Sequence, residues 1–394
     1  MCIRDRENAI DPDLKSLLIK KKLTCEHLWR EARTKNNCSI IEKDFNDLLD
    51  LVHEEASQLS YATNLTPYDS LISKYDIDYD SVKIDEVFSI IDKEIIPKYK
   101  NIQKIKSPFI YKSDISDTKI IKEIKIKLEQ LNFDFDRGRI DQSHHPFCGG
   151  ATNDVRITTR FEENILESLS ALFHETGHGV YEQNRPIQYL YEPLGQSRSL
   201  SVHESQSLFF ENHIFKSQTY FKIINTIFDN SKDLEKSFLD HYHTVRINPI
   251  RVSADEFSYP IHVFIRYQIE KEIFKNKIKF KDIKDLWNKK YLDHLEIDLN
   301  SDSEGVLQDI HWYEGIFGYF PTYALGAMIA SQIKYNCPLF DIFLKNPDEE
   351  NIKQLIIWLN NNIHQKASLY SSDEMLQSIS GEKLNSKYYL EHLV

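Results

Sequence analysis

The stretch LESLSALFHETGHGVYEQNR, residues 166–185, contains the sequence H-E-x-x-H at positions 174–178. Apolar residues recur through its first half at steps of three and four, which predicts an amphipathic helix. On a helix, residues four apart lie on one face, so His174 and His178 can bind one metal ion with Glu175 beside it. The alternative is a core or solvated helix that carries two histidines without binding a metal.

A third metal ligand must come from another part of the chain, because catalytic zinc takes three protein ligands and keeps one position open. Glu204 is the best candidate, since it lies 26 residues after His178 on a predicted helix that can fold back against the first. His203 is a rival ligand, and Glu211 and His213 on the same helix are weaker ones. The alternative for Glu204 is an ordinary carboxylate on a helix surface.

A zinc site of this composition predicts hydrolysis of an amide bond. Zinc lowers the pKa of a water ligand to about 7. Glu175 would take a proton from the water and pass it to the leaving amine. The five-residue motif does not distinguish internal from terminal cleavage of a peptide.

Composition narrows the class of protein. The chain has 394 residues and a net charge of −12, and this acidic balance argues against a nucleic-acid partner. Its five cysteines are widely spaced and form no C-x-x-C pair, which favours free thiols in a reducing compartment. Neither a membrane-length apolar run nor a secretory leader is seen. We therefore expect a cytoplasmic protein without a membrane partner.

The first six residues, MCIRDR, resemble the translation of a sequencing adapter. The alternative is an ordinary charged N-terminus. We expect residues 7–394 to form a single helical catalytic domain whose native N-terminal helices are missing.

Hydrophobic periodicity is helical through most of the chain. Alternating apolar and polar residues predict a strand near residues 154–161, just before the H-E-x-x-H helix. Pro97 is expected to end the helix that begins near residue 82. The fold class is therefore mainly α with a small β-sheet beside the helix of the metal motif. The predicted helices cover residues 13–62, 82–96, 115–131, 200–216, 234–246, 258–274, 322–335 and 352–365.

Six ordered motifs together resemble the thermostable carboxypeptidases of the carboxypeptidase Taq family. The motifs are His145-Pro146-Phe147, Asp154-Val155-Arg156-Ile157-Thr158, the H-E-x-x-H, His203-Glu204-Ser205, Ile250-Arg251-Val252-Ser253-Ala254-Asp255, and Gly305-Val306-Leu307-Gln308-Asp309-Ile310-His311-Trp312.

This resemblance implies a saddle-like, mostly helical fold with a deep groove, as in oligopeptidases of the neurolysin type. It also implies a homodimer that releases single amino acids from peptide C-termini, with broad side-chain tolerance and poor action at proline. The implied cofactor is one zinc ion per chain, for which cobalt can substitute.

Residue by residue, the resemblance makes His174, His178 and Glu204 the metal ligands and Glu175 the general base. It makes Arg251 the residue that holds the terminal carboxylate of the substrate. A planar guanidinium suits that role because it pairs with a carboxylate through two hydrogen bonds. The alternative for Arg251 is a structural ion pair with Asp255.

Six further residues are candidates for substrate binding: Asp154, Arg156, Thr158, Gln308, His311 and Tyr319. For the first two, the alternative is that Asp154 and Arg156 brace one another. For the last three, the alternative is aromatic and loop packing. His145 is expected to be structural or to line the substrate site.

The sequence departs from the family pattern after His203-Glu204-Ser205-Gln206-Ser207. Leu208 and Phe210 stand where family members usually have Arg and Trp, which puts some groove or dimer contacts in doubt. Two other functions stay open: an oligopeptidase that cleaves internally, and a non-catalytic peptide-binding protein with a relic zinc site. The intact Glu175 argues against the relic.

Overall fold

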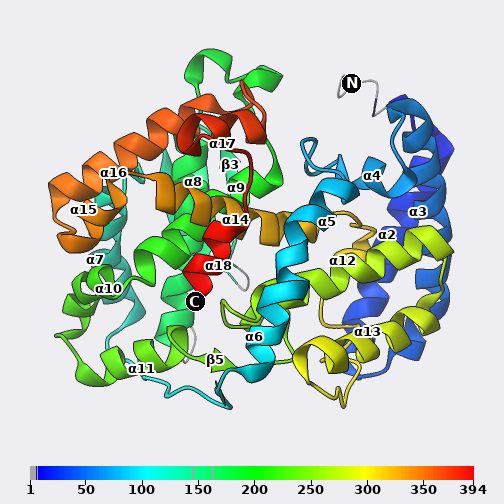
Figure 1. The fold of residues 1–394 in the computed structure, drawn as a ribbon, viewed down its shortest axis with the longest axis horizontal. Coiled ribbons are helices and arrows are strands. Elements are labelled where there is room, and N and C mark those ends of the chain that lie inside the picture. The colour runs from blue at the N-terminus through cyan, green and yellow to red at the C-terminus, as the bar shows by residue number, and fades with distance from the viewer. Residues whose placement is uncertain (1–5, 7, 144–145, 162–163) are drawn as a thin grey trace. The chain divides into compact units, whose positions relative to one another are not determined.

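The computed structural model describes residues 6, 8–143, 146–161 and 164–394. Of the predicted adapter segment only Arg6 is described, and His145 also lies outside the described residues. Helices hold 65% of the residues and strands 5%, so the predicted mainly α class is confirmed. The chain divides into two compact units (Figure 1). Unit 1 is residues 1–106 with 245–324, and unit 2 is residues 107–244 with 325–394.

Unit 1 is built from helices, with one two-stranded parallel sheet that joins its two chain segments. Its elements are α2 (Pro12–Thr34), η1 (Cys38–Ile40), α3 (Glu42–Thr63), α4 (Pro67–Ile72), α5 (Ser81–Ile90), η2 (Ile91–Ile95), α6 (Ile96–Asn101), β1 (Lys104–Ile105), β5 (Val245–Arg246), η7 (Arg251–Ser253), α12 (Tyr259–Asn276), α13 (Phe280–Leu295) and η8 (His311–Glu314). The helix α14 (Pro321–Asn336) begins in unit 1 and continues into unit 2.

Two features of unit 1 differ from the sequence prediction. The helical pattern of residues 13–62 is two helices, because the chain turns between α2 and α3 at Asn36, whose φ is 49°. The predicted stop at Pro97 is wrong, since the helix continues to Asn101. A π turn at Ile91–Ile95 ends two residues before the proline, and this wider turn accommodates a ring that cannot donate a hydrogen bond.

Helix α13 was not predicted, although its sequence carries the signal. Its buried residues follow one another at steps of three and four, as a helix packed on one face requires. They are Phe280, Ile283, Trp287, Tyr291 and Leu295.

Unit 2 contains the H-E-x-x-H helix and a three-stranded sheet. Its elements are α7 (Asp117–Gln130), β2 (Gly138–Gln142), β3 (Cys148–Ala151), β4 (Asp154–Thr159), α8 (Ile165–Gln183), η3 (Ile187–Tyr189), η4 (Pro193–Gly195), α9 (Leu200–Leu208), η5 (Phe209–Phe215), α10 (Gln218–Asn225), η6 (Thr226–Phe228), α11 (Lys232–Tyr242), α15 (Phe340–Lys345), α16 (Glu349–Asn362), η9 (His364–Lys366), α17 (Ser372–Ser380) and α18 (Lys387–Leu393).

The sheet of unit 2 has the order β2-β4-β3, with β2 parallel and β3 antiparallel to β4. Helix α8 packs against β4 and β3, which confirms the predicted small sheet beside this helix. Alternation along β4 buries Val155 and Ile157 and leaves Asp154 and Arg156 exposed. The predicted strand is thus correct, and its apolar face is part of the surface that holds α8.

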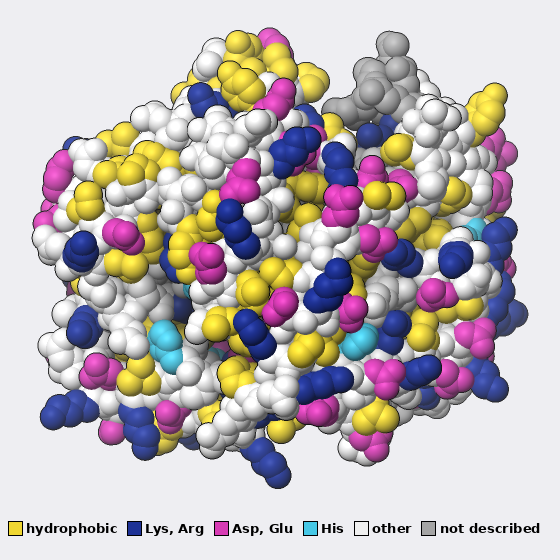
Figure 2. All heavy atoms as spheres, in the orientation of Figure 1, with side chains coloured by type: hydrophobic (Ala, Val, Ile, Leu, Met, Phe, Trp, Pro, Cys, Tyr) yellow, Lys and Arg dark blue, Asp and Glu magenta, His cyan; other side chains and the backbone are white. Residues whose placement is uncertain are grey.

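The visible face of the molecule carries charged side chains of both signs. On the face shown in Figure 2, Lys and Arg side chains are interspersed with Asp and Glu side chains. None of the helices that the structure describes combines the length and the hydropathy needed to span a membrane. The described cysteines, Cys25, Cys38, Cys148 and Cys337, are free thiols, as predicted.

Candidate metal centre

The two histidines of the motif lie on one face of α8. The helix begins at a capping residue, Asn164, whose side chain accepts a hydrogen bond from the Leu166 N–H. Its apolar stripe is fully buried, so the position of the helix in unit 2 is fixed by packing. His174 and His178 therefore project from a well-held element, in the arrangement that the four-residue spacing predicts.

Glu204 of α9 completes a group of three potential metal ligands with His174 and His178. Its Oε2 atom lies 3.4 Å from His178 Nε2 and 3.8 Å from His174 Nε2. The three ligand atoms all lie within 4.8 Å of one another. Zinc bonds to nitrogen and oxygen are about 2.0–2.2 Å long, so atoms separated by these distances can share one ion. The donor set, two imidazoles and one carboxylate, fits a catalytic divalent metal.

Close contacts between helix backbones bring Glu204 to this position. A Cβ atom at Gly177 would lie 2.4 Å from the Gln206 carbonyl oxygen, so only glycine lets α8 and α9 approach so closely. A Cβ atom at Gly326 of α14 would lie 2.8 Å from the Glu204 side chain. Ser199 caps α9 by accepting a hydrogen bond from the Val202 N–H. The lack of a side chain at these two glycines thus allows Glu204 to lie close to His174 and His178.

Glu211, which the sequence suggested as a weaker ligand, contacts the far side of the His174 ring instead. Its Oε2 lies 2.8 Å from His174 Nδ1, and its Oε1 accepts hydrogen bonds from Ser170 and Lys216. A metal-binding histidine commonly donates its other N–H to a carboxylate, which orients the ring. Glu211 belongs to η5, a π-helical continuation of α9, and such turns are frequent at functional sites.

His203, the predicted rival ligand, lies behind His178. Its Nδ1 is 2.6 Å from His178 Nδ1, and its Nε2 is 2.8 Å from Glu182 Oε1. His213, the other weaker candidate, is buried beside Phe209 and is not a member of the three-ligand group. The ligand group therefore contains Glu204 and neither rival.

The carboxylates around His174 favour a positive charge at this site. Burial opposes a charge on His174, but Glu204 and Glu211 outweigh it and raise the pKa of His174 to about 10. Burial lowers the pKa of His178 to about 4. Burial also raises the pKa of Glu175 to about 7. In the absence of a metal, a proton on His174 balances the carboxylates, and a divalent ion would replace that proton.

Arg251, the predicted carboxylate anchor, is buried in unit 1 and forms no ion pair with Asp255. Its Nε and Nη2 donate to Asp309 Oδ1 at 3.1 and 2.9 Å, and its Nη1 donates to the Tyr259 hydroxyl at 3.2 Å. Asp255 instead accepts hydrogen bonds from backbone N–H groups, including that of Arg246. The alternative pairing considered from the sequence is therefore wrong.

A second arginine shares the same carboxylate. Arg266 Nε lies 2.6 Å from Asp309 Oδ2, and the Arg266 side chain is fully buried. Arg251 and Arg266 together hold the pKa of Asp309 far below its usual range, although burial opposes this. The three side chains carry two positive charges and one negative charge, so this arginine cluster (Arg251, Arg266, Asp309) has an excess of one positive charge.

Gln308 braces this cluster. Its Oε1 accepts hydrogen bonds from the Arg251 N–H and from Arg266 Nη2, and its Nε2 donates to the Pro249 carbonyl. All of its polar atoms are thus engaged within unit 1. These contacts favour a role in holding Arg251 rather than direct contact with a substrate.

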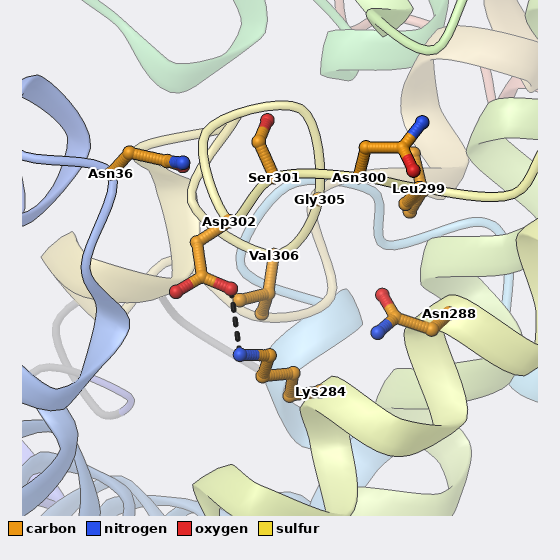
Figure 3. A pocket seen from close by; sticks show the side chains of 9 residues that line it. All are labelled: Asn36, Lys284, Asn288, Leu299, Asn300, Ser301, Asp302, Gly305 and Val306. Atoms are coloured by element: carbon orange, nitrogen blue, oxygen red, sulfur yellow. Dashed lines mark ion pairs between the residues drawn. The ribbon is translucent and has the colours of Figure 1, made fainter.

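The loop before Gln308 borders a polar pocket of about 330 Å³ in unit 1 (Figure 3). In Figure 3 the Asp302 carboxylate reaches from the loop to Lys284 of α13, at 2.7 Å. Asp302 also accepts a hydrogen bond from the Cys38 N–H. This ion pair anchors the loop that leads to Gln308. The pocket is lined by Asn36, Lys284, Asn288, Leu299, Asn300, Ser301, Asp302, Gly305 and Val306.

His311 and Tyr319 lie together in an aromatic group of unit 1. The centroids of their rings are 5.4 Å apart, and His311 Nε2 lies 3.2 Å from the Tyr323 hydroxyl. Burial lowers the pKa of His311 to about 4, so this imidazole is neutral near pH 7. Within the described part of the chain, its buried Nδ1 has no hydrogen-bond partner.

Asp154 and Arg156 form a two-fold hydrogen-bonded ion pair on the exposed face of β4, with Nη2–Oδ2 and Nε–Oδ1 distances of 2.7 and 3.1 Å. Thr158 is buried and accepts a hydrogen bond from the Phe147 N–H. These contacts favour the alternative in which the first two residues brace one another. Leu208 and Phe210, the departures from the family pattern, are buried in unit 2.

The family model of the carboxypeptidase Taq (M32) metallopeptidases matches residues 3–394. The chain belongs to this family. Carboxypeptidase 1 of Bacillus subtilis is 35% identical over 385 residues, which are 93% of this chain and 75% of that protein. Members of the family are metal-dependent carboxypeptidases, so the chain is by family a metallopeptidase and its expected substrates are peptides.

Solved structures agree with this family. Metallocarboxypeptidase 1 of Trypanosoma cruzi is 30% identical with a TM-score of 0.89, and the match covers 99% of this chain and 81% of that one. A Pyrococcus furiosus carboxypeptidase, described as Apo-Mg, is 28% identical with a TM-score of 0.88, and the match covers 99% and 80%. The predicted family and helical class are confirmed, and the family implies a divalent metal.

Sequence analysis did not identify three residues that the structure places at the metal group or at the arginine cluster: Glu182, Arg266 and Asp309. Glu182 lies four residues after His178, and this spacing alone puts it on the same helix face. Arg266 interrupts the apolar run of α12, and a buried arginine requires a partner. Asp309 lies within the motif of residues 305–312, but its partners are distant in sequence.

Proposed function

We propose that the protein is a zinc carboxypeptidase that releases single amino acids from the C-termini of peptides. The observation that carries this proposal is the group of His174, His178 and Glu204 beside Glu175, in a chain of a metal-dependent carboxypeptidase family. Two imidazole nitrogens and one carboxylate oxygen are a donor set typical of catalytic zinc. Cobalt accepts the same ligands and is expected to substitute.

Peptide hydrolysis would depend on both the metal and the residues of the site. When bound, the ion would activate a water molecule and polarise the scissile carbonyl group. Glu175 is buried, and within the described residues no hydrogen bond to its carboxylate is found. That carboxylate would accept a proton from the attacking water and deliver it to the amine of the departing amino acid.

Arg251 would bind the terminal carboxylate of the substrate. The support for this role is the excess positive charge of the arginine cluster, because a buried charge is unfavourable until it is paired. An incoming carboxylate would supply the missing negative charge. An oligopeptidase that cleaves internally does not need a free carboxylate next to the cleaved bond. The positive charge of the arginine cluster therefore favours a carboxypeptidase.

His311 and Tyr319 are the remaining candidates for contact with the substrate. A neutral imidazole and a phenol can each donate a hydrogen bond to a developing oxyanion or to the peptide backbone. The contacts of Asp154, Arg156, Thr158 and Gln308 support local structural roles instead. The family resemblance further supports broad side-chain tolerance, poor action at proline and a homodimer, and the free thiols support a cytoplasmic location.

The test is release of the terminal amino acid from an N-acylated Ala-Arg dipeptide, with metal analysis of the same sample. We expect release of free arginine, about one zinc per chain, and loss of activity with a chelator and in Glu175→Gln. Zinc binding without release in the wild type would contradict the proposed activity. Internal cleavage of longer peptides would replace it with an oligopeptidase.

A further inference from the structure

The two histidines of the metal group are braced differently at their Nδ1 atoms. His174 Nδ1 faces a carboxylate oxygen of Glu211 at 2.8 Å, whereas His178 Nδ1 faces a nitrogen of another histidine, His203, at 2.6 Å. An ionised carboxylate only accepts hydrogen bonds, so it keeps a proton on His174 Nδ1. A histidine nitrogen can donate or accept, so His203 by itself does not determine which nitrogen of His178 carries the proton.

The second nitrogen of His203 decides the direction of this hydrogen bond. His203 Nε2 lies 2.8 Å from Glu182 Oε1, and the carboxylate requires a proton on that nitrogen. In its neutral form His203 carries only this one N–H, so its Nδ1 is bare and accepts the Nδ1–H of His178. The lone pair of His178 is then on Nε2, the nitrogen that lies 3.4 Å from Glu204.

Glu182 is itself held in place. Arg185 Nη2 lies 2.6 Å from Glu182 Oε2, and the same guanidinium donates to Thr152 Oγ1 at 3.1 Å and to the Gly195 carbonyl at 2.9 Å. Arg185 is buried, so its charge is little screened by solvent. The carboxylate of Glu182 is therefore fixed in both charge and orientation by residues from three segments of unit 2.

We infer that Glu182 is a positioning residue of the metal centre, which acts through His203 to hold His178 in the tautomer whose Nε2 can bind a divalent ion. The inference rests on the proposed metal site. It extends the H-E-x-x-H motif by one residue on the same helix face, since Glu182 follows His178 by four positions and His174 by eight. In this role Glu182 contacts neither the Nε2 atoms of the metal ligands nor the substrate.

The first test compares zinc affinity in Glu182→Gln and Glu167→Gln, measured on metal-free protein by competition with a chromophoric chelator. Glu167 is the matched control, because it lies on the same helix, faces a histidine (His241 Nε2, 3.5 Å) and is outside the metal group. We expect Glu182→Gln to weaken zinc binding on the order of 10- to 100-fold and Glu167→Gln to leave it unchanged. Equal affinity of the two variants would overturn the inference.

The second test asks whether Glu182 acts through His203. Asn and Leu have similar size, but only Asn offers an oxygen that can accept the His178 Nδ1–H without help from Glu182. We expect His203→Asn to bind zinc more tightly than His203→Leu, and Glu182→Gln to add no further loss in the His203→Asn background. Equal affinity of the two His203 variants, or a full additional loss, would overturn the inference.

These outcomes separate the inference from the proposal beneath it. A wild-type protein that binds no zinc would contradict the proposed metal site. A wild-type protein that binds zinc as tightly as Glu182→Gln would contradict only the role of Glu182. If Glu182→Gln does not fold, as judged by circular dichroism of the metal-free protein, the His203 pair still decides the question.

Discussion

The metal group of unit 2 and the arginine cluster of unit 1 are both buried and charged, but their charges have opposite signs. Around His174, the carboxylates of Glu175, Glu204 and Glu211 outnumber the one nearby lysine, Lys216. In the arginine cluster, two guanidinium groups share one carboxylate. The first site therefore favours a cation and the second an anion. Under the proposed function, a divalent metal and the terminal carboxylate of a peptide would supply those charges.

The largest effect is expected from Asp309→Asn, which keeps the shape of the side chain and removes its charge. Arg251 and Arg266 would then face one another without a counter-charge, and we expect the free energy of unfolding to fall by about 3–5 kcal/mol. Urea denaturation of the metal-free protein measures this change. Adding Arg251→Met should recover part of the loss, and an Asp309→Asn protein of unchanged stability would remove the charge argument from this cluster.

Glu270 offers a contrast with Asp309 inside unit 1, because it is a buried carboxylate with no cationic partner among the described residues. It accepts hydrogen bonds from the Tyr68 hydroxyl, the Trp312 indole and the Gly318 N–H. Burial outweighs these donors and raises the pKa of Glu270 from 4.5 to about 7. The folded protein therefore binds this proton more tightly than the unfolded chain does.

The tighter binding of a proton by Glu270 stabilises the folded protein. This stabilisation is fully present below pH 4.5 and is lost as the pH rises through about 7. A shift of this size corresponds to roughly 3 kcal/mol. We expect Glu270→Gln to remove this dependence, so the difference in unfolding free energy between wild type and variant should change between pH 5 and 8. A constant difference across that range would show that Glu270 does not titrate there.

Arg251→Met tests whether the positive excess serves substrate binding. A hydrogen bond to a charged group contributes about 1.5–3 kcal/mol, so kcat/KM for a peptide with a free C-terminus should fall on the order of 10- to 150-fold. A peptide with an amidated C-terminus lacks the carboxylate and should be hydrolysed no worse by the variant than by wild type. A variant that kept full exopeptidase turnover would exclude Arg251 as the anchor.

Gly177→Ala tests how closely α8 and α9 must approach. The added methyl group would meet the Gln206 carbonyl at 2.4 Å, so one helix must move. We expect a stability loss of about 1–3 kcal/mol and weaker zinc binding, because Glu204 would shift away from His174 and His178. Gly149→Ala is the control, because its added methyl group would meet only ordinary contacts and should leave zinc affinity unchanged. Gly381→Ala would not serve, because the φ of Gly381 is 78° and favours glycine.

The smallest effect is expected from Asp154→Ala, which breaks an exposed ion pair. Exposed pairs contribute about 0–1 kcal/mol, so neither stability nor kcat/KM should change much. Steady-state kinetics and thermal denaturation check both quantities. A large loss of kcat/KM with unchanged stability would instead support the substrate-binding role considered from the sequence.

Sequence alone determined the features that depend on residues close together in the chain. Periodicity predicted most helices, and four-residue spacing placed His174 and His178 on one face, because helix geometry is fixed by local backbone bonds. The sequence favoured Glu204 over Glu211 as the third ligand, but only the tertiary structure showed where each carboxylate lies. Glu204 groups with His174 and His178, whereas Glu211, on the π turn η5, contacts His174 Nδ1.

The same reason explains why the arginine cluster was only partly predicted. The sequence predicted Arg251 as a substrate anchor, with an ion pair to Asp255 only as the alternative. It did not predict the contacts with Asp309, which Arg251 and Arg266 make from distant segments. Pairing across distant segments is set by packing of the core, which brings charges together only after the helices are placed. Local spacing therefore predicted the helix face that carries the metal motif, whereas packing decided the partners that hold each charged group.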